Sequence, residues 1–305
     1  MTRRAVWLLE ACLYVALSVP LAIFPIRFGE FLGILLFYLW RSRRKIAIEN
    51  LRKSISSHAI SISETPEKVI RNNFRNLGRS LIEIVKIYYG IGSGIIDSVE
   101  FEGTENVYKA KSEGRGILFI TGHCGNWELM AIATSAKLLH SSGVARQINN
   151  PYINKFIERV RQRYGNSVIY KKGALKAVMK VLKNNGSVGI LMDQAVLSDE
   201  GYMIDFFGRG AWTTKMPALI ARKTGAVVLP AFIHRTDKGH RITIYPEVKL
   251  SDIADKEEAV IEDTKKFSGF IEEYIKEHPS EWLWIHRRWK RVKSYPVLFL
   301  PHKPL

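Results

Sequence analysis

A histidine and a glutamate stand five residues apart in residues 122–128, which read GHCGNWE. A hydroxyl group is a poor nucleophile, and a histidine with a near-neutral pKa can take its proton as it attacks an electrophile. A carboxylate beside the imidazole fixes the tautomer and stabilises the imidazolium that forms. His123 is therefore predicted to act as a general base with Glu128 as its partner, and a substrate hydroxyl takes the place that a serine has in a triad.

The two side chains need a turn to meet, because a spacing of five places them about 140° apart on a regular helix. Residues 117–121, ILFIT, are a continuous apolar run, which is typical of a strand buried on both faces. His123 then follows the carboxyl end of this strand, Asn126 caps the next helix, and Glu128 falls in its first turn. This edge of an open α/β sheet is where ligands bind.

Apolar runs alternate with helical patterns along the rest of the chain. Strands are expected at 98–101, 117–121, 168–170, 188–192, 227–233 and 241–245. Helices are expected at 66–89, 127–139, 152–164, 173–184, 214–224 and 256–277. The alternation indicates an α/β fold with a mixed, largely parallel central sheet flanked by helices.

The apolar N-terminal region indicates a membrane anchor. Residues 5–26 are apolar over about the 20 residues that a helix needs to cross a bilayer, and Pro20 and Pro25 would kink or end that helix. A second apolar stretch, 28–40, is too short to span and is expected to lie at the interface. The heavier basic cluster follows this region, which places the main domain in the cytoplasm. We therefore predict an anchor and basic juxtamembrane segment at 1–45 and a catalytic domain at 46–305.

The formal net charge of the 305-residue chain is +17, so an acidic partner is expected: nucleic acid, an anionic membrane or an acidic protein. The tail combines Trp282, Trp284 and Trp289 with Arg287, Arg288 and Lys290, a composition that suits a membrane interface or single-stranded nucleic acid. The N-terminal anchor favours the membrane over nucleic acid.

The two cysteines, Cys12 and Cys124, show neither a disulfide framework nor metal-ligand spacing. They fit a reducing compartment. Cys124 lies beside His123 and could be a nucleophile that the histidine activates, although a lone cysteine is more often a small buried hydrophobe.

Further blocks follow the His–Glu motif in a recognisable order. They are Arg146 with Asn150 and Pro151, Met192-Asp193-Gln194, Phe206-Phe207-Gly208 with Thr213 and Thr214, residues 221–226, ARKTGA, and residues 281–290, EWLWIHRRWK. Together with GHCGNWEL, these blocks resemble the bacterial lipid A biosynthesis acyltransferases, the late acyltransferases of lipopolysaccharide assembly, within the lysophospholipid acyltransferase superfamily. The resemblance covers essentially the whole chain.

This resemblance implies an inner-membrane enzyme, facing the cytoplasm, that transfers an acyl chain from acyl carrier protein to a hydroxyl of a lipid A precursor. It implies that His123 and Glu128 are catalytic and that Arg146 and Asp193 belong to the active site. The same matched blocks predict substrate-binding roles for Arg146, Asn150, Asp193, Gln194 and Thr213.

No metal or bound cofactor is expected, because acyl carrier protein or coenzyme A delivers the acyl group as a cosubstrate. The expected partners are acyl carrier protein, a lipid A precursor and anionic inner-membrane lipids. Backbone amides of residues 122–125, or a basic side chain, are expected to stabilise the oxyanion.

Three alternatives remain open from the sequence. The first is an acyl-CoA-dependent acyltransferase that acts on a glycerophospholipid or a glycolipid. The second is a non-enzymatic, membrane-tethered binder, which should tolerate loss of His123. The third is a hydrolase that uses the same His–Glu pair on water.

Overall fold

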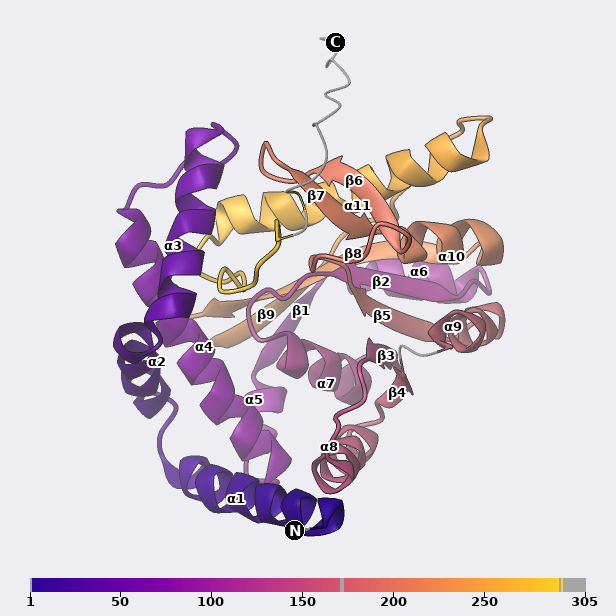
Figure 1. Ribbon diagram of the computed structural model, residues 1–305. Coiled ribbons are helices and arrows are strands. Elements are labelled where there is room, and N and C mark those ends of the chain that lie inside the picture. The colour runs from indigo at the N-terminus through magenta and orange to yellow at the C-terminus, as the bar shows by residue number, and fades with distance from the viewer. Residues whose placement is uncertain (1, 171–172, 291, 293–305) are drawn as a thin grey trace.

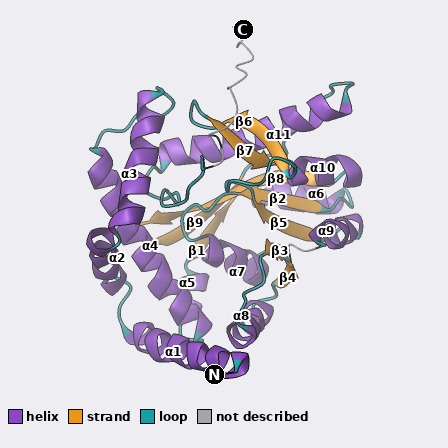
Figure 2. Cartoon of the chain, viewed as in Figure 1, coloured by secondary structure: helices purple, strands orange, loops and turns teal. Residues whose placement is uncertain are grey.

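A computed structural model describes residues 2–170, 173–290 and 292 of the chain. Its centre is a seven-stranded sheet of order β1-β9-β8-β2-β5-β3-β4, in which only the β8–β9 pair is antiparallel (Figures 1 and 2). Its strands are β1 (Val99–Glu102), β2 (Ile117–Thr121), β3 (Ser142–Ala145), β4 (Ser167–Tyr170), β5 (Ser187–Leu191), β8 (Val227–Thr236) and β9 (Gly239–Ile244). The predicted mixed, largely parallel sheet is confirmed.

Helices cover both faces of this sheet. One face carries α9 (Ala174–Lys183), α10 (Met216–Thr224) and α11 (Lys256–Glu277), and the other carries α6 (Thr104–Ser112), α7 (Trp127–Lys137) and α8 (Pro151–Arg163). Strand β2 is buried at every residue, with Leu118 and Ile120 in one core cluster and Ile117 and Phe119 in the other. Its uninterrupted apolar sequence therefore reflects its central position.

Several elements lie outside the predicted alternation, among them β3 and α6, for which no strand or helix was expected. A separate antiparallel hairpin, β6 (Gly201–Asp205) and β7 (Gly210–Thr214), packs beside α11. The basic segment after the apolar N-terminus is a helix, α3 (Arg41–Ser56), whose residues Ala47 and Leu51 are fully buried. Two helices lie between α3 and the sheet in sequence: α4 (Pro66–Tyr88) is long and amphipathic, whereas α5 (Ser93–Asp97) is a single turn.

The N-terminal apolar region forms α1 (Arg3–Ile23) and α2 (Phe28–Leu39). Pro20 lies in the last turn of α1, and Pro25 follows its end. Among the described residues, α1 alone is long and apolar enough to cross a membrane by length and composition; its most apolar window has a mean hydropathy of 2.0 and is 11% buried. The last residues of the predicted 46–305 domain, 293–305, lie outside the described residues.

Both apolar helices are attached to the α/β domain. Helix α2 crosses α4 so closely that a Cβ atom on Gly78 would lie 1.9 Å from the carbonyl oxygen of Gly29, which only glycine permits. Along α1, Ser18 hydrogen-bonds the Tyr89 hydroxyl at 2.6 Å, and Lys86 donates to the Ala22 carbonyl at 2.7 Å. These contacts join the apolar surface to α4, which also reaches the candidate site.

Candidate active site

His123 lies directly beyond the carboxyl end of β2, and Asp193 lies directly beyond the carboxyl end of β5. The two strands are adjacent and parallel, and Thr121 pairs with Leu191 in register. His123 and Asp193 each stand two residues past this pair, so the sheet brings together two side chains that are 70 residues apart in sequence.

The imidazole and the carboxylate are directly hydrogen-bonded. His123 Nδ1 lies 2.7 Å from Asp193 Oδ1, and Asp193 Oδ2 accepts from the His123 backbone N–H at 3.0 Å and from Trp282 Nε1–H at 2.8 Å. Only 2% of the Asp193 side chain is exposed, against 19% for His123. The prediction that Glu128 is the carboxylate on the imidazole is therefore corrected: that partner is Asp193.

Electrostatics support a proton-accepting histidine. Burial alone would raise the pKa of Asp193, but the His123 imidazole and the hydrogen bonds from His123 and Trp282 hold it well below its usual range. Burial lowers the pKa of His123, and the Asp193 carboxylate, aided by Glu128, more than reverses this and raises it above 6.5. An ionised Asp193 holds the proton on Nδ1, which leaves Nε2 as the basic nitrogen.

Gln194 and Trp127 border the imidazole. The Gln194 side-chain amide lies 3.1 Å from His123 Nε2, and the Trp127 ring meets the imidazole edge-on with centroids 5.1 Å apart. Gln194, predicted to bind substrate, therefore touches the nitrogen that would receive a substrate proton.

Glu128 lies in the first turn of α7, as predicted, but its hydrogen-bonding partners are on other helices. Arg161 on α8 donates to both carboxylate oxygens, at 2.8 and 2.9 Å, and the Tyr88 hydroxyl at the end of α4 lies 3.4 Å away. The sequence did not predict that Arg161 would pair with Glu128, because a basic residue on an amphipathic helix is usually a solvated surface charge. Glu128 acts on His123 through its charge, and its catalytic role stays a prediction.

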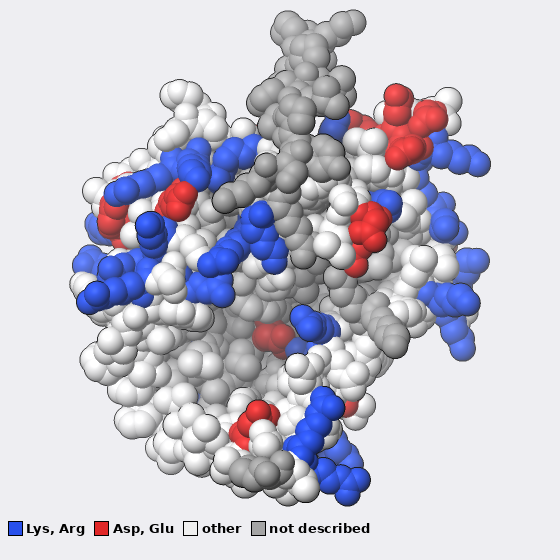
Figure 3. All heavy atoms as spheres, viewed as in Figure 1, with Lys and Arg blue, Asp and Glu red and all other residues white. Residues whose placement is uncertain are grey.

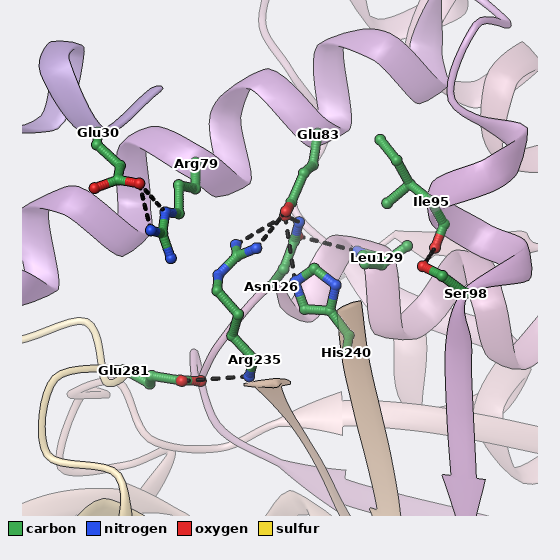
Figure 4. A network of polar contacts seen from close by, with 10 residues as sticks. All are labelled: Glu30, Arg79, Glu83, Ile95, Ser98, Asn126, Leu129, Arg235, His240 and Glu281. Atoms are coloured by element: carbon green, nitrogen blue, oxygen red, sulfur yellow. Dashed lines mark hydrogen bonds and ion pairs between the residues drawn. The ribbon is translucent and has the colours of Figure 1, made fainter. Parts of the chain in front are cut away.

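A buried polar network holds the start of α7 (Figure 4). Asn126 caps the helix by accepting from the Leu129 backbone N–H at 3.2 Å, as predicted, and donates to Glu83 Oε2 at 2.9 Å. Glu83, 1% exposed on α4, also accepts from Arg235 on β8, and His240 Nε2 lies 3.4 Å from it. The loop between His123 and Glu128 is thus anchored from its helical end.

The C-terminal segment anchors the same loop from the other side. Gly125 N–H donates to the Glu281 carbonyl at 2.8 Å, and Leu283 N–H donates to the His123 carbonyl at 3.1 Å. Trp282 is 1% exposed, and Trp284 and Arg288 are also buried. The prediction that these residues face a membrane interface is therefore wrong: this part of the tail packs against the catalytic loop.

The backbone amides of this loop are already used. The His123, Cys124 and Gly125 N–H groups donate to Asp193 Oδ2, the Gly122 carbonyl and the Glu281 carbonyl. The prediction of an oxyanion hole from these amides is therefore wrong for these three. Cys124 is fully buried, and burial raises the pKa of its thiol well above the usual value. This favours a small buried hydrophobe over a nucleophile.

Three other predicted residues lie away from His123 contacts. Arg146 is exposed in the segment after β3. Asn150 caps α8, accepting from Tyr152 and Ile153 N–H groups, while its Nδ2 donates to the Trp7 carbonyl and to Glu10 on α1. Thr213 is fully buried in β7 and accepts from Arg288. Their substrate-binding roles stay predictions, and those of Asn150 and Thr213 compete with the contacts named here.

The face that carries α3 and α8 is hollowed at its centre, and basic side chains gather over α3 (Figure 3). Exposed cations on α3 are Arg41, Lys45, Arg52 and Lys53. Within the part of the chain that the structure describes, no three His, Cys, Asp or Glu side chains are grouped so as to hold a metal ion.

Replacing Arg161 by methionine should lower kcat/KM for the reaction proposed below by about 10²-fold, because Glu128 loses the ion-pair partner that fixes its position. An unpaired Glu128 carboxylate should raise the pKa of His123 further, so the acid limb of the pH profile should move to higher pH. The exposed Arg159, on the same helix, provides the control Arg159→Met. An unchanged acid limb in Arg161→Met would exclude electrostatic coupling through Glu128.

The chain is similar to known proteins over nearly its full length. The family model for the bacterial lipid A biosynthesis acyltransferases matches residues 1–291. The chain is 26% identical to the lipid A biosynthesis palmitoleoyltransferase of Escherichia coli over 91% of this chain and 88% of that protein. It is also 26% identical to the lauroyltransferase of the same organism, over 93% and 90%. A phosphatidylinositol mannoside acyltransferase of Mycolicibacterium smegmatis is 22% identical, over 74% of each chain.

Proposed function

Because the chain belongs to the bacterial lipid A biosynthesis acyltransferase family, we propose that it transfers a fatty acyl group from acyl carrier protein to a hydroxyl of a lipid A precursor, with His123 as general base. The relatives named as lipid A acyltransferases support an O-acyltransferase of lipid A biosynthesis. The observation that carries the mechanism is the 2.7 Å contact between His123 Nδ1 and Asp193 Oδ1.

In the proposed reaction, His123 Nε2 removes the proton of the acceptor hydroxyl while the oxygen attacks the carbonyl carbon of the thioester. A carbon–oxygen bond forms, and the tetrahedral intermediate carries the negative charge on the former carbonyl oxygen. The carbon–sulfur bond then breaks, and the imidazolium returns its proton to the departing thiolate. Asp193 stabilises the imidazolium between these two transfers.

A donor for the oxyanion must come from outside the three occupied loop amides. The Gln194 side-chain amide lies 3.1 Å from Nε2, the nitrogen that would take the substrate proton, so we assign it to bind a substrate oxygen. This assignment also agrees with the predicted substrate-binding role of Gln194.

The apolar helix α1 and the family indicate membrane association. We propose the inner membrane, with the α/β domain facing the cytoplasm, where acyl carrier protein is available. The basic side chains of α3 are suited to two acidic partners: anionic lipid phosphates and acyl carrier protein. The exposed cation Arg146 is a further candidate for contact with phosphate.

A second candidate acceptor comes from the phosphatidylinositol mannoside acyltransferase relative. The same His123–Asp193 pair could acylate a glycolipid or glycerophospholipid from acyl-CoA, because the chemistry of a hydroxyl and a thioester is shared. The acceptor therefore has to be tested directly.

The test is to incubate the detergent-purified protein with acyl-carrier protein thioesters and a tetra-acylated lipid A precursor, and to analyse the products by mass spectrometry. We expect a mass gain of one acyl chain for the wild type. His123→Ala, checked for an unchanged melting curve, is the matched background.

A mass gain that His123→Ala retains would rule out His123 as the base. No gain in a folded wild type would exclude lipid A as the acceptor, and acyl-CoA with other lipids would then be tested. Free fatty acid formed without acceptor, in place of transfer, would instead identify a hydrolase.

A further inference from the structure

Residues 281–283 of the C-terminal tail run antiparallel to residues 123–125 of the catalytic loop. Cys124 and Trp282 form an isolated antiparallel bridge, and one backbone hydrogen bond lies on each side of it. From α4, Asn73 donates to the Trp282 carbonyl at 2.7 Å. The backbone of Trp282 is therefore held by the catalytic loop and by α4 together.

The indole of Trp282 is enclosed by three aromatic rings. Its ring centroid lies 5.5 Å from that of Phe206, 4.7 Å from that of Trp284 and 6.2 Å from that of Trp289. Only 1% of the residue is exposed, so the indole cannot turn without moving its neighbours. A buried indole N–H needs an acceptor, and this one donates to Asp193 Oδ2 at 2.8 Å.

Asp193 needs such a fixed donor, because the torsion that turns an aspartate carboxylate is broad and only loosely restricted. Its Oδ2 accepts from two N–H groups on different segments, the His123 backbone and the Trp282 indole. Both are hydrogen bonds to a charged acceptor, the stronger kind. With Oδ2 held from two directions, Oδ1 is left on His123 Nδ1, at 2.7 Å.

We propose that Trp282 is a positioning residue of the active site, whose indole N–H holds the Asp193 carboxylate in the orientation that keeps Oδ1 on His123 Nδ1. The expected effect on rate rests on the proposed acyl transfer, whereas the effect on the imidazole does not. The C-terminal tail then contributes to the chemistry through one hydrogen bond, although none of its residues is assigned to touch the substrate.

The tail supplies matched controls, because its three tryptophans pack together but their N–H groups differ. Trp284 Nε1 donates to the Pro279 carbonyl at 2.7 Å, which is a purely structural contact. Among the described residues, Trp289 Nε1 has no hydrogen-bonding partner. Only the Trp282 N–H reaches Asp193. Substitution of each tryptophan by phenylalanine therefore separates loss of packing from loss of the bond to the carboxylate.

The test compares Trp282→Phe with Trp284→Phe and Trp289→Phe. A further variant replaces Trp282 by benzothienylalanine, which keeps the shape of the double ring but has sulfur in place of the N–H group, so it carries the test if Trp282→Phe does not fold. Both Trp282 variants should lower kcat about 10- to 100-fold, the scale of one hydrogen bond to a charged group. KM should be nearly unchanged, because no contact with substrate is removed, and both control variants should keep the wild-type kcat.

A second readout follows the imidazole directly, by NMR titration of protein with isotope-labelled histidine, in which the His123 signal is the one missing from His123→Ala. A carboxylate that turns away from Nδ1 stabilises the imidazolium less, so the pKa of His123 should fall in both Trp282 variants. The other titratable or charged groups that interact with the His123–Asp193 pair, among the described residues, are Glu128, Cys124, His286 and Arg288. All of them are retained in every variant.

A lower kcat and a lower pKa of His123 in both Trp282 variants, absent from the two controls, support the proposal. A loss of kcat with an unchanged pKa of His123 overturns it in favour of a structural role, as does an equal loss in all three tryptophan positions. A higher pKa also overturns it, because the N–H would then only withdraw charge from Asp193. If the wild type transfers no acyl group, the proposed function fails, and the NMR titration alone decides whether Trp282 positions Asp193.

Discussion

Asp193→Asn should lower kcat about 10⁴-fold while leaving the fold intact, the scale of loss when a triad carboxylate becomes an amide. Asp193 Oδ2 already accepts from the His123 N–H and Trp282 Nε1–H groups, so the asparagine oxygen must take this position. The amide nitrogen then faces His123 Nδ1 and donates to it. This forces the proton onto Nε2, and the imidazole can no longer accept a proton from the substrate hydroxyl.

The measurement is kcat across a pH series, together with a melting curve. Loss of the Asp193 charge should also lower the pKa of His123, so any residual activity should keep its acid limb at lower pH than in the wild type. Asp263→Asn is the control, because Asp263 is a fully buried carboxylate that pairs with Arg222 at 2.6 Å, away from His123. Asp193→Asn within about 10-fold of the wild type would refute the tautomer argument.

Glu83→Ala should destabilise the protein by about 3–5 kcal/mol, the usual cost of removing one partner from a buried ion pair. Arg235, with only 17% of its side chain exposed, would lose its carboxylate, and Asn126 Nδ2 would lose its acceptor (Figure 4). Chemical unfolding in detergent measures the change. Glu100→Ala removes the solvent-exposed pair with Arg241 and should barely alter the free energy of unfolding.

The contribution of Glu83 to the free energy of unfolding should also depend on pH, within a defined pH range. Burial raises the pKa of this carboxyl, but His240 and Arg235 outweigh burial and lower it from 4.5 to about 2. A depressed pKa in the folded state means that the contribution is complete above 4.5 and is lost as the pH falls from 4.5 toward 2. The same decline in Glu83→Ala would show that other carboxylates cause it.

Local patterns predicted the central elements well. The apolar run ILFIT and the cap Asn126 are local signals, and the structure has β2 over the predicted residues and α7 beginning one residue after the cap. Helix α4 was predicted at 66–89 because Thr65 and Pro66 mark its start and its apolar residues recur at helical spacing. In the structure it begins at Pro66 and ends at Tyr88. The hairpin of β6 and β7 was missed, since its short strands are neither apolar throughout nor joined by a strong turn sequence.

The site was predicted only in part, because its partners meet through the sheet. His123 and Asp193 become neighbours when β2 and β5 pair, and no local spacing specifies which strands are adjacent. The resemblance brought Asp193 into the active site, but not onto the imidazole. Likewise, Arg161 reaches Glu128 only because α8 packs near α7, and Trp282 reaches Asp193 because the chain returns to the loop after α11.

The glycine crossing of α2 over α4 has a consequence for how a lipid substrate is approached. Helix α4 carries Glu83 beneath the catalytic loop and Tyr88 beside Glu128, so this one helix connects the apolar helices to the loop of His123. In the membrane arrangement proposed above, this connection would set the height of the imidazole relative to the bilayer. A lipid acceptor would then have to bring its hydroxyl to that height before it could react.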